Sequence, residues 1–175
     1  MGPIRNLAKD FCVLSRQILR CANQGVPRTR FLHQVTQMLL DFSGCDAIEL
    51  WLEEPDYSFR WERTLHPKQS FKFKSVPRSK KRSQSNNYEK LCADIIRGTV
   101  DTSLPFFTKN GSFWTGDVKT PLTLEQSTKK AENPTRLVIS GDYRSVAIIP
   151  FAVTDDETAL LHLKSLKPVS YTHLR

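Results

Sequence analysis

The sequence predicts an α+β domain in which helices cover a central antiparallel sheet. Residues 145–164 hold two apolar runs separated by a polar turn, which is the pattern of an antiparallel hairpin. Residues 47–52 and 59–63 alternate apolar and polar positions, as strands do. Residues 4–21 and 28–43 instead repeat their apolar positions every three or four residues, as amphipathic helices do. Helices followed by paired strands favour an α+β fold.

The first predicted helix carries a regular apolar stripe. Its members follow the three-four spacing of a heptad seam: Ile4, Leu7, Phe11, Leu14, Ile18 and Cys21. Such a stripe can pack on the domain or pair with a second copy of the chain. We expect it to form the seam of a parallel homodimer, with residues 1–24 as a dimerisation and signalling helix.

The second predicted helix spans residues 28–43, with Gly44 as the residue that ends it. After the two alternating strands, residues 71–75 alternate once more. They precede a basic loop, rich in Ser and Asn, at residues 77–87. A short amphipathic helix is expected over residues 88–96.

The segment 103–117 is unusually aromatic. Asn110-Gly111 divides it and predicts a hairpin with a type I′ turn, which needs positive φ at both central residues. Three Phe and one Trp lie within nine residues of this segment, and they cannot all face water. These rings either cap the core or wall a pocket.

The hairpin at residues 145–164 is expected inside the sheet, because its first run is apolar on both faces. Pro150 removes one ladder donor, so we expect a bulge or an irregular pairing there. The carboxylates of Asp155, Asp156 and Glu157 are expected to be solvated in the turn.

Length and composition indicate one ordinary domain. The chain has 175 residues and no apolar run near the roughly 20 residues of a membrane helix. Its first 20 residues mix charges into apolar positions, unlike a secretory signal, so we expect a cytoplasmic protein. The four cysteines form no C-x-x-C pair, which argues against a zinc site and a disulfide framework.

The net charge of +8 raises the question of nucleic acid. The excess is concentrated in Lys68, Lys72, Lys74, Arg78, Lys80, Lys81 and Arg82. Nucleic-acid binders interleave such residues with aromatics, and the loop that holds the last four has none. A solvated loop is the preferred interpretation, and a nucleic-acid-binding domain is a less favoured alternative.

No catalytic constellation is visible in the sequence. The nucleophile elbow G-x-S-x-G, Gly-rich phosphate loops and the zinc motif H-E-x-x-H are all missing. His162 stands alone on the last strand and is expected to be a wall residue rather than a ligand to haem or metal. His33 is expected at the surface. We therefore predict no catalytic residue, no metal site and no enzyme activity for this chain.

Three stretches carry a family resemblance. They are ILRCANQGVPRTRFLHQVTQMLLDFSGCDAIELWL, LPFFTKNGSFWTGD, and GDYRSVAIIPF followed by ALLHLKS. Together they resemble a GAF domain, closest to those of bacterial multidomain sensors, which often stand beside PAS domains and histidine kinases. The resemblance covers residues 18–166.

The resemblance implies a sheet of five or six strands, with the N-terminal helices on one face. A pocket is then expected over the other face, closed by loops and short helices. By position, the candidate pocket residues are Trp51, Trp61, Phe106, Phe107, Trp114, Asp142, Tyr143 and Arg144. Arg144 could hold an anion with both guanidinium arms or pair with Asp142.

The resemblance also implies a function. We expect a sensory domain of a two-component signalling protein that binds a small ligand or partner and relays the change through a dimeric helix. Covalently linked PAS and kinase domains are expected in the parent protein. The cofactor stays unknown, because neither a bilin-type cysteine nor the NKFDE-like pattern of cyclic-nucleotide binders is present. The alternative is a ligand-free dimerisation module.

The resemblance fixes the expected domain limits. Residues 25–166 are expected to form the sensory domain, which lacks the final helix of the family at its C-terminal end. Residues 167–175 look like a translated sequencing adaptor, and we expect them to be non-native.

Overall fold

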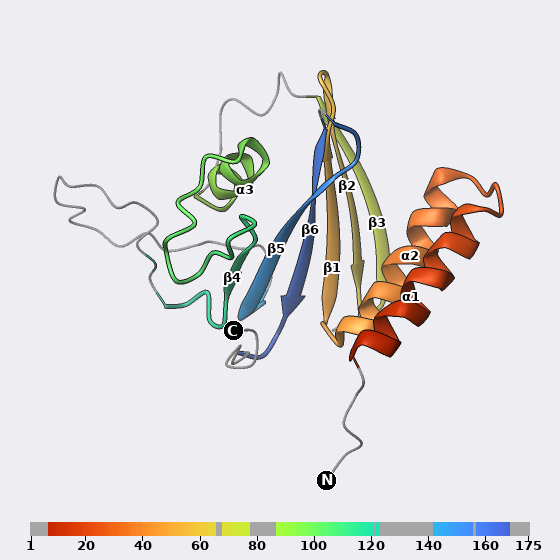
Figure 1. The fold of residues 1–175 in the computed structure, drawn as a ribbon, viewed down its shortest axis with the longest axis horizontal. Helices are drawn as coiled ribbons and strands as arrows, with labels where there is room; N and C mark the ends of the chain where they lie inside the picture. Colours follow the sequence, from red (N-terminus) through yellow and green to blue (C-terminus); the bar gives the residue numbers. More distant parts are fainter. Residues whose placement is uncertain are drawn as a thin grey trace, which may run out of the picture.

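The computed structural model describes residues 7–65, 68–77, 87–120, 122, 142–155 and 157–168. The described residues form three α-helices and six β-strands (Figure 1). In chain order these are α1 (Leu7–Ala22), α2 (Arg28–Ser43), β1 (Ala47–Glu53), β2 (Tyr57–Thr64), β3 (Ser70–Pro77), α3 (Asn87–Arg97), β4 (Phe113–Thr115), β5 (Ser145–Ala152) and β6 (Thr158–Ser165).

The six strands make one sheet in the order β3-β2-β1-β6-β5-β4, and every neighbouring pair is antiparallel. The predicted α+β class with a sheet of five or six strands is confirmed. The β5–β6 hairpin lies inside the sheet, between β1 and β4. It is paired on both sides, as its apolar first run indicates.

The helices lie on opposite faces of this sheet. Helix α2 packs on β1 and β2, α1 packs on α2, and α3 covers the other face near β5 and β6 (Figure 1). Alternate residues of β1 face opposite sides of the sheet. Leu50 and Leu52 therefore pack in the core beneath α2, while Trp51 packs in the core beneath α3. A single strand therefore connects the two sides of the domain.

The stripe on α1 faces α2 only in part. Leu14 and Cys21 are 6% and 4% exposed, so they are buried within the protomer and unavailable to a second copy. Phe11 is 59% exposed, although its ring contacts Phe42 of α2 at 6.4 Å. The heptad spacing was compatible with both kinds of packing, and these residues pack on the domain itself. Ile4 and the side chain of Leu7 lie outside the described part of the chain.

Two local predictions were wrong. Pro150 causes neither the expected bulge nor an irregular pairing, because the β5–β6 register runs unbroken from Ser145↔Ser165 to Ala152↔Thr158. Strand β4 reaches only as far as Ile148 along β5, so Pro150 lies where that side of β5 is an edge. Edges are where strands accept proline without losing a ladder bond.

The turn at residues 108–112 is the second correction. Only Gly111 has positive φ, at 78°, whereas a type I′ turn also needs positive φ at Asn110. The Gly111 N–H donates to the Thr108 carbonyl at 3.0 Å, and the Thr108 N–H donates to the Ser112 carbonyl at 2.8 Å. Phe107 and Phe113 form a bridge beyond it, so the chain does reverse here, through a turn with one left-handed glycine.

None of the helices described has the length and apolar content that crossing a bilayer requires. All four cysteines are free thiols, of which Cys21 and Cys92 are buried. The basic residues Arg78, Lys80, Lys81 and Arg82, and Asp156 of the hairpin turn, lie outside the described residues.

Candidate functional site

A cavity of about 280 Å³ lies between α3 and the sheet. Strands β1 and β2 form its floor, and α3 forms its roof. The residues that line it are Trp51, Glu53, Arg60, Glu89, Lys90, Ala93, Ile96 and Arg97. Its volume is close to the lower end of the range of small-molecule sites, about 300 Å³.

The periodicity of each element places these side chains. Trp51 and Glu53 are two residues apart on β1 and so share one face, and Arg60 is the register partner of Trp51 on β2. On α3, Glu89, Ala93 and Ile96 follow the four-three spacing of one helix face. Both elements thus direct alternate residues into the same space.

Arg60 occupies the centre of this arrangement. Its guanidinium carbon lies 3.7 Å from the ring centroid of Trp51, which is a cation–π contact. Its Nη2 donates to Glu89 at 3.1 Å, which ties β2 to α3. Its Nε is buried and has no hydrogen-bond partner among the described residues. The described residues thus leave one donor of Arg60 unsatisfied.

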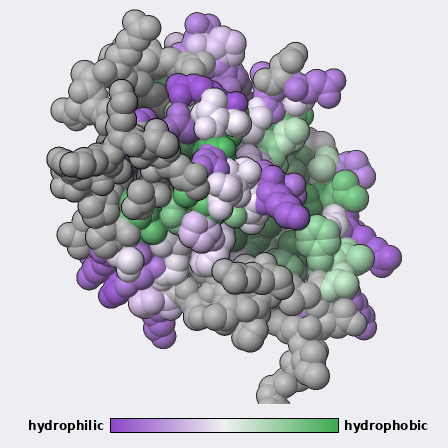
Figure 2. All heavy atoms as spheres, turned by 60° about the vertical axis from the view of Figure 1, so that its left-hand side comes forward, coloured by the Kyte–Doolittle hydropathy of each residue, from purple (hydrophilic) through white to green (hydrophobic). Residues whose placement is uncertain are grey.

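The charges around the cavity are mixed, with a small positive excess. Arg60, Lys90 and Arg97 are cationic, while Glu53 and Glu89 are anionic. An aromatic floor with cations around it is suited to a flat ligand that carries a carboxylate or phosphate group. Figure 2 shows the α3 side of the molecule, where hydrophobic surface gathers between hydrophilic residues.

A buried ion pair lies on the same face of the sheet. Lys164 of β6 is 2% exposed, and its Nζ lies 2.5 Å from Glu49 and 3.5 Å from Glu62. Burial alone would raise the pKa of Glu49, but the positive charge and hydrogen bond of Lys164 hold that pKa below its usual value. Charge is thus retained inside the domain rather than neutralised.

His162 adjoins this pair and is completely buried. Its ring lies 4.6 Å from that of Trp51, and its Nδ1 shares a short hydrogen bond with the Tyr88 hydroxyl. Burial lowers the pKa of His162 to about 3 and raises the pKa of Tyr88, so the imidazole is neutral and the phenol protonated. The tautomer of the imidazole sets which of these two atoms donates. The imidazole Nε2 has no hydrogen-bond partner among the described residues.

The structure separates the predicted pocket residues. Trp51 lines the cavity, whereas Trp61 lies on the other face of the sheet, beneath α2. Phe106 and Phe107 pack against Phe113 at 5.9 and 5.5 Å, so these rings cap the core. Trp114 is half-buried on β4 and donates its backbone N–H to Phe106.

The three residues that precede β5 have different roles. Asp142 is exposed, and the ring of Tyr143 lies 5.6 Å from the Lys164 ammonium. Two guanidinium nitrogens of Arg144 donate hydrogen bonds to the Asp117 carboxylate, at 3.0 and 2.5 Å. The partner of Arg144 is therefore Asp117 and not Asp142. Hydrogen bonds from Arg144 and from the Lys119 backbone lower the pKa of Asp117 to about 2. The Nε and Nη2 donors of Arg144 are thus engaged within the fold.

Sequence reasoning missed most of the cavity lining. Arg60 stands between Phe59 and Trp61 in an alternating strand, and that position alone places it on the face opposite these two rings. The polar residues of α3 carried no comparable signal, because a charged helix face is usually solvated. Only the packing of α3 over β1 and β2 shows that Glu89 and Lys90 line a cavity that is partly open to solvent.

No protein-family model matches the chain, and no curated protein shows significant similarity to it. Among the residues described, no three His, Cys, Asp or Glu side chains gather as a metal site requires.

Proposed function

We propose that the chain is a GAF-type sensory domain of a bacterial signalling protein, which binds a small anionic ligand under α3. The observation that carries this proposal is the cavity itself, with Arg60 spanning Trp51 and Glu89 inside it. The antiparallel sheet with N-terminal helices on the opposite face agrees with the GAF resemblance. A cytoplasmic location and linked PAS and histidine kinase domains belong to the same proposal.

In the proposed relay, strand β1 connects the cavity to helix α2. A ligand that displaces Arg60 or tilts α3 changes the packing of Trp51, whose strand neighbours Leu50 and Leu52 pack beneath α2 with Leu32. Because consecutive residues of a strand face opposite sides, a small shift of β1 reaches α2 directly. Helix α1 packs on α2 and passes the shift to a dimer.

A ligand-free dimerisation module is the second candidate. The Arg60–Glu89 ion pair favours it, because the domain's own side chains then close the cavity. In that case the residues around the cavity only stabilise the fold, and the function of the domain is dimerisation through its N-terminal helices.

Two measurements separate these candidates. Native mass spectrometry of the gently purified chain should reveal a retained small molecule. A thermal-shift screen of carboxylate and phosphate metabolites should find stabilisers, since ligand at 100 times its Kd adds about 2.7 kcal/mol. A chain that retains nothing, and that no metabolite stabilises, contradicts the sensory proposal and supports the module.

A further inference from the structure

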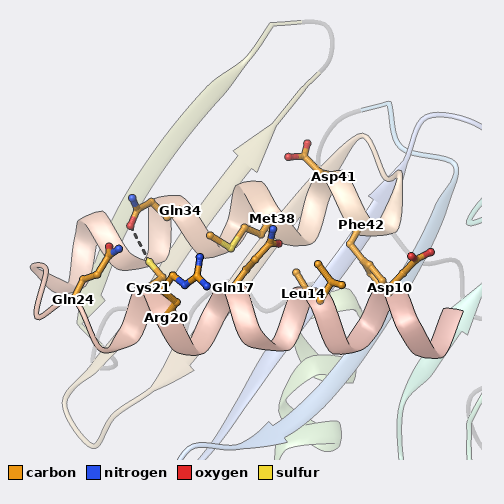
Figure 3. A pocket seen from close by; sticks show the side chains of 11 residues that line it. Asp10, Leu14, Gln17, Arg20, Cys21, Gln24, Gln34, Met38, Asp41 and Phe42 are labelled. Atoms are coloured by element: carbon orange, nitrogen blue, oxygen red, sulfur yellow. Dashed lines mark hydrogen bonds between the residues drawn. The ribbon is translucent and has the colours of Figure 1, made fainter. Parts of the chain in front are cut away.

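A second and larger hollow, of about 560 Å³, runs along the groove between α1 and α2 (Figure 3). One line of α1 side chains borders it, spaced three, four and three residues apart: Asp10, Val13, Gln17 and Arg20. This line lies beside the buried residues Leu14 and Cys21, on the part of α1 that α2 leaves open. The groove therefore presents a continuous helix face without a partner among the described residues.

The charges of this groove are segregated along its length. Asp10 of α1 and Asp41 of α2 lie at one end, and Arg20 lies toward the other (Figure 3). Ten residues separate Asp10 from Arg20, which is about 15 Å along a helix. The middle is less polar, with Val13 47% exposed and Met38 half-buried opposite Gln17.

We infer, resting on the proposed dimeric relay, that this groove receives α1 of a second copy in antiparallel orientation. In a two-fold contact centred between Val13 and Gln17, Asp10 of each protomer meets Arg20 of the other, and Asp41 adds to the acidic end. Val13 of each protomer then faces Gln17 of the other. Because the contact is two-fold symmetric, the Asp10–Arg20 pair forms twice, once at each end of the interface.

The parallel arrangement is disfavoured by the same charges. It sets Asp10 beside Asp10 and Arg20 beside Arg20, so both ends meet like charge. It also needs the stripe that holds Leu14 and Cys21, and those side chains are already buried against α2. The groove thus replaces the heptad stripe as the contact surface.

Charge reversal tests the orientation. Sedimentation equilibrium at about 50 mM salt compares the wild-type chain with Asp10→Arg, Arg20→Asp and the double variant. Each single reversal replaces two attractive contacts with two repulsive ones, so the dimer Kd should rise about tenfold. The double reversal restores opposite charges across the interface and should return the Kd to within about twofold of the wild type. Raising salt should weaken the wild-type dimer.

Lys74→Asp supplies the matched control, since Lys74 is exposed on β3, away from the groove, and its reversal should leave the Kd unchanged. A wild-type chain that stays monomeric overturns the inference. So does a dimer in which the double reversal is no tighter than the single ones. Native mass spectrometry on the same samples keeps the two proposals apart: a monomer that retains a ligand overturns only the antiparallel dimer, and a rescued dimer without ligand contradicts only the sensory site.

Discussion

Lys164 and Glu49 form an ion pair inside the protein, with 2.5 Å between Nζ and Oε2 and only 2% of the lysine exposed. They come from β6 and β1, the two strands at the centre of the sheet. Both side chains lie on the face of the sheet beneath α3, and Glu49 is two residues from Trp51, which lines the cavity.

Removing one partner of this pair should destabilise the fold strongly. Lys164→Met leaves Glu49 buried without its counter-charge, and we expect a loss of about 3–5 kcal/mol in the free energy of unfolding near pH 7. Urea denaturation measures it. Glu62→Gln is the control, because Glu62 lies 3.5 Å from Nζ and its side chain is 28% exposed, so its loss should be below about 1 kcal/mol. Equal losses in both variants would contradict a dominant Lys164–Glu49 pair.

The same pair predicts acid sensitivity. The pKa of Glu49 is lower in the folded state than its ordinary value of 4.5, so its stabilising contribution is present above that value. It is lost as the pH falls through the lowered folded pKa. Lys164→Met removes the cause of the shift, so the difference in stability between wild type and variant should narrow on acidification. A difference that stays constant from pH 7 to pH 3 would exclude this linkage.

His162 adds a second pH dependence. Its pKa is about 3 in the folded state against 6.5 ordinarily, so between these values the unfolded chain binds the extra proton. The free energy of unfolding should therefore fall with the pH below 6.5, by at most about 1.4 kcal/mol per unit. His162→Gln removes this slope while keeping a side chain that can form a hydrogen bond with Tyr88. His33→Gln is the control: burial and Arg63 lower the pKa of His33, but its side chain is exposed, so the slope should change little. An unchanged slope in His162→Gln would refute the assignment.

Filling the cavity should weaken ligand binding without unfolding the domain. Ala93 is half-buried on α3 and lines the cavity, so Ala93→Trp places an indole in the 280 Å³ space. We expect any ligand found by mass spectrometry to bind at least tenfold more weakly, with little change in Tm. Lys90→Gln removes one charge without filling space and should weaken an anionic ligand only several-fold. Undiminished binding in Ala93→Trp would place the site elsewhere.

The turn at residues 108–112 gives a local test. Gly111 has φ of 78°, and a Cβ there meets only Val100 Cγ2 at 3.9 Å, so Gly111→Ala is limited by backbone strain rather than space. We expect a loss of about 1 kcal/mol in stability. Asn110→Ala should be nearly neutral, because Asn110 does not have positive φ. A large loss in Asn110→Ala would instead favour the type I′ turn that the dipeptide indicates.

The elements of the fold were largely predictable. The alternation of β1 and the apolar run of β5 identify strands because side-chain direction repeats every two residues whatever packs on them. Asn110-Gly111 shows the limit of such local signals: the sequence predicts the reversal, while the structure shows that Asn110 lacks the positive φ of a type I′ turn.

The candidate site was much less predictable. Trp51 was expected in a pocket, and it lines the cavity, but Trp61 appeared equivalent to it in the sequence. The residues that surround Trp51, above all Arg60 and Glu89, are separated by 29 positions, and no local pattern connects them.

The sequence by itself determined the helices, the strands and the two-sided character of the sheet, because these depend on short-range periodicity. Only the tertiary structure decided which face of α1 is buried, which tryptophan meets the cavity, and that Lys164 lies against Glu49 across 115 residues. Burial and the pairing of distant charges depend on which surfaces pack together, and short-range sequence patterns do not show that.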